Sequence, residues 1–133
     1  MIGPFQIALY RWVDPEHTDN HTAQTPRQPF PVTFEAVFAE LEIWPRMFIE
    51  PDGAFVWVGV EQKNGGIGKA WQLDGHLYDR DGRMLFVELQ GSCPRESLEQ
   101  LVAVLGIPLD EICVEQRRAG TVQAWSTFLA SYR

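Results

Sequence analysis

Cys93 is the residue of this sequence best suited to covalent chemistry. It lies in the segment Gly-Ser-Cys-Pro-Arg at residues 91–95, where a strand is predicted to end and a helix to begin. A thiol at a helix N-terminus lies at the positive end of the helix dipole, and the guanidinium of Arg95 would add a second positive charge. Both effects lower the pKa of a thiol towards a reactive thiolate. Cys93 and Arg95 are therefore the candidate catalytic residues.

The other interpretation of Cys93 is structural. Cysteine is among the most buried residue types and commonly fills space as a small apolar side chain. In this interpretation Cys93 packs where the helix meets the sheet and has no chemical role. The position of the thiol distinguishes the two hypotheses. A concave polar pocket around it indicates an enzyme, whereas burial in the core indicates a binding protein.

Two further patterns resemble ligand-binding motifs but lack the context that those motifs need. His17 and His21 have a spacing that aligns two imidazoles for zinc on a helix, yet they lie in a proline-flanked polar segment. The glycine-rich run at residues 65–69 is followed by Ala70, where a phosphate-binding P-loop requires serine or threonine. We therefore predict no metal site, no phosphate site and no cofactor.

Glu88 is the remaining candidate for acid–base chemistry, because it lies among apolar neighbours on a predicted strand. Desolvation raises the pKa of a carboxyl group, which suits a general acid or base. Such a residue more often lies on the solvent side of a sheet. A small thiol-dependent or acid–base enzyme with Cys93 at the corner between strand and helix is the alternative hypothesis for the function.

The length and composition of the chain indicate one folded domain. The chain has 133 residues, of which 45% are hydrophobic and 12% aromatic. This length is close to that of a common single domain, and the apolar content excludes a disordered chain. We therefore predict a single globular domain over residues 1–133.

The charge balance excludes two classes of partner. Acidic residues outnumber basic ones by 18 to 11, and the formal net charge is −7. Nucleic acids and anionic membranes both attract clustered positive charge, so neither is an expected partner. No apolar run reaches the roughly 18–20 residues that span a bilayer, and residues 1–13 lack the basic start of a signal peptide. We expect a cytoplasmic location, in which Cys93 and Cys113 remain free thiols.

The pattern of apolar residues predicts an α+β fold. Strands are predicted at residues 5–13, 47–50, 54–60, 70–79, 84–89 and 112–114. Helices are predicted to begin after Thr33, at Pro94 and at Thr121. The order strand–helix–strand–strand–strand–strand–helix–strand–helix indicates a single mainly antiparallel sheet with helices packed on it. Residues 14–32 are polar, contain four prolines and are predicted to form a long surface loop.

Asp-Gly pairs mark the predicted hairpins. Asp and Gly tolerate the left-handed conformations of tight turns, so Asp52-Gly53 and Asp81-Gly82 are predicted turns. A third pair, Asp74-Gly75, is predicted to form a bulge inside a strand, because a turn there would leave two very short strands. The glycine-containing segment at residues 62–69 is predicted to be a flexible connection.

Both faces of the predicted sheet are apolar. Within residues 54–60, three valines point to one side, while Phe55 and Trp57 point to the other. Phe86 is assigned to the same aromatic face as Phe55 and Trp57. A sheet covered on one side only is expected to carry polar residues on the other. Either helices cover both faces, or the second face binds a partner.

We favour a non-enzymatic binding or interaction module that uses the face of Phe55, Trp57 and Phe86. Its candidate partners are a second copy of the chain, another protein, or a small apolar ligand.

Overall fold

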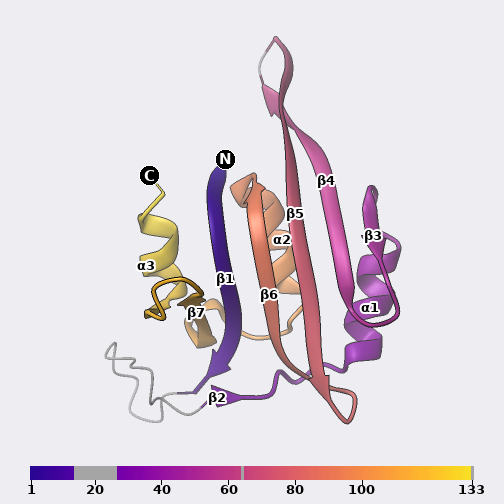
Figure 1. Cartoon of the computed structure of the whole chain (residues 1–133), viewed down its shortest axis with the longest axis vertical. Helices are drawn as coiled ribbons and strands as arrows, with labels where there is room; N and C mark the ends of the chain where they lie inside the picture. The colour runs from indigo at the N-terminus through magenta and orange to yellow at the C-terminus, as the bar shows by residue number, and fades with distance from the viewer. Residues whose placement is uncertain (14–26, 64, 133) are drawn as a thin grey trace.

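The computed structural model describes residues 1–13, 27–63 and 65–132, which form an antiparallel sheet of eight strands with three α-helices (Figure 1). The strands are β1 (Ile2–Trp12), β2 (Arg27–Gln28), β3 (Met47–Ile49), β4 (Ala54–Lys63), β5 (Gly66–Arg80), β6 (Arg83–Cys93), β7 (Ile112–Gln116) and β8 (Val122–Ala124). The helices are α1 (Phe34–Glu42), α2 (Arg95–Ala103) and α3 (Trp125–Ala130), with a 3-10 turn at Leu109–Glu111. The strand order is β3-β4-β5-β6-β1-β7-β8, and β2 pairs with the end of β1.

The predicted α+β class with a single antiparallel sheet is confirmed. Two short strands add to the predicted order. Strand β2 forms inside the segment predicted as the loop 14–32, of which residues 14–26 lie outside the described residues. Strand β8 occupies the start of the last predicted helix, because residues 122–124 pair with β7. The helix predicted from Thr121 therefore begins at Trp125.

Both predicted Asp-Gly turns are present. At the first, the backbone N–H of Gly53 donates to the carbonyl of Glu50 at 2.9 Å, and Gly53 has a φ of 99°. At the second, Arg80 and Arg83 pair directly, so Asp81 and Gly82 form a two-residue turn. Their φ angles of 53° and 85° are the two positive values that a type I′ hairpin needs.

The bulge predicted at Asp74-Gly75 is wrong, because this pair lies in a regular part of β5. Gly75 pairs with Phe55 of β4 on one side and with Leu89 of β6 on the other. The register shift between β5 and β6 occurs instead between Tyr78 and Asp79. Glycine is required at position 75 for a steric reason, since a Cβ atom there would collide with the ring of Phe55.

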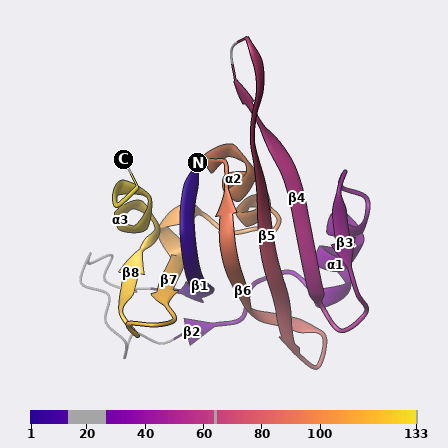
Figure 2. The ribbon, with the colours of Figure 1, turned by 45° about the horizontal axis from the view of Figure 1, so that its top comes forward.

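The flexible connection predicted at residues 62–69 is also replaced by regular structure. The pairing of β4 with β5 continues to Lys63 and Gly66, with a register shift between Val60 and Gln62. Figures 1 and 2 show the result, a two-stranded arm of β4 and β5 that extends beyond the other strands.

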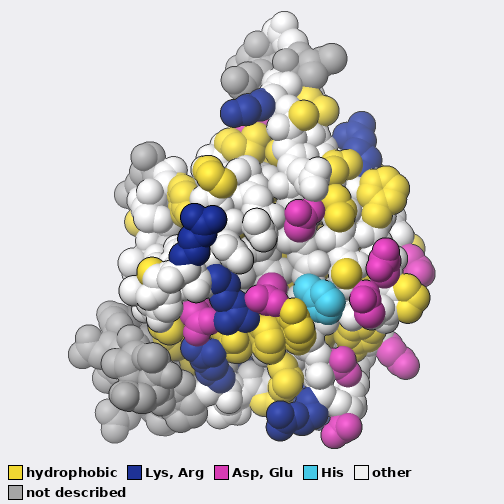
Figure 3. Space-filling model, in the orientation of Figure 1, with side chains coloured by type: hydrophobic (Ala, Val, Ile, Leu, Met, Phe, Trp, Pro, Cys, Tyr) yellow, Lys and Arg dark blue, Asp and Glu magenta, His cyan; other side chains and the backbone are white. Residues whose placement is uncertain are grey.

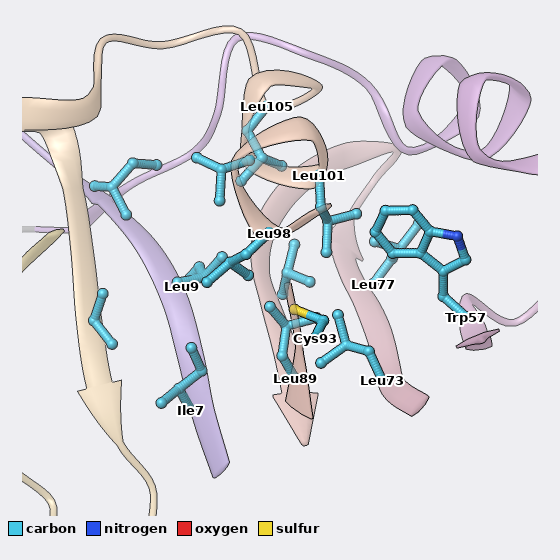
Figure 4. Packing of buried hydrophobic residues seen from close by; sticks show 14 of the residues in the cluster. Ile7, Leu9, Trp57, Leu73, Leu77, Leu89, Cys93, Leu98, Leu101 and Leu105 are labelled. Carbon is cyan, nitrogen blue, oxygen red and sulfur yellow. The ribbon is translucent and has the colours of Figure 1, made fainter. Parts of the chain in front are cut away.

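The described helices bury one face of the sheet. Leu98 and Leu101 of α2, Leu41 of α1 and Phe128 of α3 belong to one cluster of buried residues with the sheet residue Leu9. Figure 4 shows Leu98, Leu101 and Leu105 packed against leucines of β1, β5 and β6. In the described part of the chain, no α-helix packs on the opposite face. The first alternative from the sequence, in which the helices cover both faces of the sheet, is therefore not seen for the described helices.

The described helices are also too short or too polar for a membrane span. Among the residues that the structure describes, no helix combines the length and the apolar character needed to cross a bilayer.

Replacing Gly75 with alanine tests the packing of Phe55. We expect Gly75→Ala to lower the free energy of unfolding by about 1–3 kcal/mol, because the added methyl group overpacks the Phe55 ring. Gly66→Ala is the matched control, since a Cβ there meets open space and should change stability by less than about 0.5 kcal/mol. Urea denaturation measures both. Equal effects of the two substitutions would contradict the steric role of Gly75.

Candidate functional site

Cys93 is sealed in the core. It is the last residue of β6, its side chain has no exposed surface, and it packs in the cluster that contains Leu98 of α2. Burial raises the pKa of the Cys93 thiol to about 12. The lowered pKa expected from the helix start is therefore wrong, because desolvation of the thiolate outweighs the positive charge of the chain N-terminus and the hydrogen bond from the backbone of Leu98. Of the two placements considered for Cys93, the structure shows burial in the core and not a concave polar pocket.

Arg95 does not complete a catalytic pair with Cys93. Its guanidinium is exposed and bonds the carboxylate of Glu99 at 2.9 Å, one turn further along α2. The second cysteine, Cys113, is buried as a free thiol, and burial raises its pKa to about 12 as well. The structure thus brings together neither a nucleophile with a base nor a thiolate with a cation at these residues.

The histidines considered for zinc, His17 and His21, lie outside the described residues. Within the described residues, no group of three His, Cys, Asp or Glu side chains is arranged to hold a metal ion.

Phe55 and Trp57 do not share a face with Phe86, so this part of the prediction is wrong. Phe55 and Trp57 are only 3% and 6% exposed and lie on the helix-covered side. Leu77 and Val87 pair with each other and point into the core. Phe86 and Tyr78 form the next pair along the two strands, and side chains of successive pairs point to opposite faces. The regular register of β5 through Gly75 therefore places Phe86 on the opposite side of the sheet.

Trp57 instead takes part in a tryptophan cluster on the helix-covered side. Its ring centroid lies 5.1 Å from that of Trp44 and 5.2 Å from that of Trp71. The cluster lines an open cleft of about 690 Å³ between the base of the β4–β5 arm and the start of α2, where Arg95 and Glu96 form part of the wall.

Phe86, the third residue of the predicted aromatic face, lies on the side of the sheet opposite the helices, which we call the open face. Its side chains include Gln6, Ala8 and Tyr10 of β1, Phe86, Glu88 and Gln90 of β6, Asp74, His76 and Tyr78 of β5, Ala54, Val56 and Val58 of β4, Phe48 of β3, Cys113 and Glu115 of β7, and Arg117. Ala8 and Cys113 lie at the base of this face and have no exposed surface. Figure 3 looks onto this face and shows hydrophobic side chains in a band that is bordered by charged ones.

Four rings on the open face stack across three strands, and we call them the aromatic row. Tyr10 stacks on Phe86 with centroids 5.0 Å apart, Phe86 on Tyr78 at 4.3 Å, and Tyr78 on His76 at 4.4 Å. The guanidinium of Arg27 lies 3.8 Å from the centre of the Tyr10 ring and extends the row onto β2. Cross-strand aromatic neighbours stabilise a sheet by roughly 0.2–1 kcal/mol each, and stacked planar groups also present contact area to a partner.

Charged side chains border the aromatic row on one side. Arg117 bonds the carboxylates of Glu88, at 3.0 Å, and Glu115, and its guanidinium lies over the ring of Phe86. Arg27 bonds Glu115 from the other side at 2.8 Å. Partial burial opposes the charge of Arg117, but the oxygens of Tyr10, Glu88 and Glu115 keep its pKa above the ordinary value. Two arginines and two glutamates thus form a neutralised network that holds the side chains in place.

Glu88, the acid–base candidate, is part of this surface network and is not desolvated in a pocket. Its carboxylate also accepts a hydrogen bond from the Tyr78 hydroxyl, which raises the pKa of that tyrosine. A shallow hollow of about 200 Å³ lies beside it, lined by Asp74, His76 and Gln90. Tyr10, Tyr78 and Arg117 were not identified from the sequence, although both tyrosines alternate with buried residues of their strands.

The chain was compared with protein-family models, with curated proteins and with solved structures, and none of the three comparisons found a match.

The thiol environment predicts low reactivity of both cysteines. With a pKa of about 12, the thiolate fraction of Cys93 or Cys113 at neutral pH is on the order of 10⁻⁵. We expect a thiol reagent such as Ellman's reagent to modify neither cysteine in the folded protein and both in denaturant. Rapid modification of Cys93 in the folded state would revive the enzyme hypothesis.

The same pKa values predict a loss of stability in alkali. The folded thiols keep their protons up to about pH 12, whereas the unfolded chain loses them near the ordinary value of 9.0. The unfolded state therefore binds fewer protons between these pH values, and the free energy of unfolding falls as the pH rises through that window. Urea denaturation at a series of pH values measures this, with Cys93→Ala as the variant in which the slope is reduced.

Proposed function

We propose that the protein is a non-enzymatic interaction module and that the open face is its binding surface. The observation that carries the proposal is the aromatic row of Tyr10, Phe86, Tyr78 and His76, which lies on a sheet face that no described helix covers. Interface cores are enriched in aromatic residues and arginine, the residue types that meet here.

The rigidity of the open face supports this proposal. The rings are stacked on one another, and the guanidinium groups of Arg27 and Arg117 are bonded to Glu115 and Glu88. Side chains that are already ordered lose little conformational freedom on binding, so more of the contact energy appears as affinity. The burial of Cys93 supports the non-enzymatic part, because it removes the one nucleophile that the sequence offered.

The edges of the sheet support a face as the binding surface. Strand β3 at one edge and β8 at the other each have three residues, and β4 carries a register shift where it extends beyond β3. Short and irregular edge strands are common ways to prevent pairing with another chain. Contact through the face therefore agrees better with this architecture than contact through an edge.

Photo-crosslinking in cells tests the proposal. A benzoylphenylalanine placed at Phe86 should give a discrete crosslinked product, because its ring would lie in the interface. The matched control is the same residue at Ile43, which is 75% exposed and lies at the end of α1, away from the open face. We expect no discrete product from position 43. Equal labelling at the two positions, or none at Phe86, would exclude the open face as the binding surface.

A further inference from the structure

We propose that the partner of the open face is a second copy of the chain, packed face to face about a twofold axis that runs parallel to the strands between β1 and β6. This inference rests on the proposed function and names its partner. It follows from the positions of the side chains on the open face, which match their own images across that axis.

The open face consists of rows of side chains that run across the strands. In one row Tyr78, Phe86 and Tyr10 are direct neighbours on β5, β6 and β1, and the buried Cys113 of β7 continues this row. In the next, His76 of β5, Glu88 of β6 and Ala8 of β1 are neighbours, and Glu115 of β7 continues this row. A rotation about an axis along the strands keeps each row at its own level and exchanges its two ends.

The exchange brings the aromatic side chains of one copy onto those of the other. Between β1 and β6, the axis places Phe86 of one copy over Tyr10 of its partner, and Tyr10 over Phe86. Because the contact is made twice in a twofold interface, each favourable pair counts double. Two sheets that pack face to face in this way form a sandwich, as in proteins in which both sheets belong to one chain.

The same rotation also brings polar and charged groups together. Tyr78 of one copy comes to lie over β7 of the other, at the level of Cys113, which is fully buried. Beside it the guanidinium of Arg27 lies over the Tyr10 ring. The ring of Tyr78 thus meets a cation, a favourable contact at an aromatic face. In the neighbouring row the same operation places His76 opposite Glu115, and Glu88 opposite Ala8, beside the Arg117 guanidinium that bridges Glu115 and Glu88 of its own chain.

The size of the face is sufficient for a stable dimer. The rotation exchanges β6 with β1, β5 with β7 and β4 with β8, and strand spacing and rise per residue give the part of the sheet from β4 to β8 an area of roughly 600–800 Å². Each partner in an ordinary protein interface contributes about 800 Å². The open face is therefore of the right order to form one such interface without help from the sheet edges.

Charge variants at Tyr78 test the geometry. In the dimer Tyr78→Lys faces Arg27 of the partner, whereas Tyr78→Glu faces it with the opposite charge. We expect wild type and Tyr78→Glu to sediment at micromolar concentration with a mass near twice the 15.2 kDa of one chain. Tyr78→Lys should weaken dimerisation by at least about tenfold. A general charge effect predicts the reverse order, because the chain is acidic and lysine lowers its net negative charge.

A complementary substitution provides the second arm. Arg27→Glu alone should also weaken the dimer, since it removes the cation that faces Tyr78. Mixed with Tyr78→Lys, it should restore a dimer that contains one copy of each variant, because the introduced ammonium group would then face the introduced carboxylate. Thermal unfolding of each variant as a dilute monomer shows whether it remains folded. Because Arg27→Glu also removes the ion pair with Glu115 inside the same chain, recovery of the dimer in the mixture is the decisive result, and not the weakening by the single variant.

The outcomes separate this inference from the proposed function. A wild-type chain that remains monomeric, or a mixture that fails to dimerise when wild type does, overturns the twofold arrangement. If position 86 still crosslinks in cells, but to a different protein, the open face is a binding surface and only the second copy is excluded. If position 86 gives no product and wild type is monomeric, both proposals fail.

Discussion

The contact between the Phe55 ring and the bare backbone of Gly75 is the constraint on which the rest of the structure depends. It lets β4, β5 and β6 pair in regular register through the centre of the sheet. A bulge at this position would have shifted the alternation of β5 by one residue and moved its apolar side chains to the other face. Because the register is regular, Leu73 and Leu77 lie with Phe55 in the core, and His76 and Tyr78 lie opposite.

The one-sided packing of the helices follows from this alternation. The buried face gathers the large aliphatic side chains, and α1, α2 and α3 contribute to the same cluster. Cys93 lies inside that cluster, so the helix start that was expected to activate its thiol instead buries it. A reactive thiolate needs a hydrated or charged environment, whereas a core position needs a neutral, desolvated side chain, and the structure shows the second for Cys93.

The open face combines a row of stacked rings with a network of paired charged groups. Its rings are stacked across β1, β6 and β5, and its charged groups are paired with one another beside them. Ordinary solvent-facing sheet surfaces carry scattered polar residues. Here the order of the side chains supports a role in recognition, and their arrangement about the line between β1 and β6 supports a second copy of the chain as the partner.

The amino-acid sequence by itself determined the class of the fold and most of its local structure. The Asp52-Gly53 and Asp81-Gly82 turns, the alternating strands and the helices with apolar stripes depend on interactions between residues close in the chain, which periodicity and turn chemistry reveal. The grouping of Phe86 with Phe55 was wrong because β4 and β6 are not neighbours in the sheet. Which residues of β4 and β6 share a face depends on how each strand pairs with β5, which lies between them. Only the tertiary structure decided that all three described helices cover the same face, and that Tyr10, Phe86, Tyr78 and Arg27 from four strands meet on the other. The physical reason is that side-chain contacts across a sheet depend on long-range register, which no local pattern encodes.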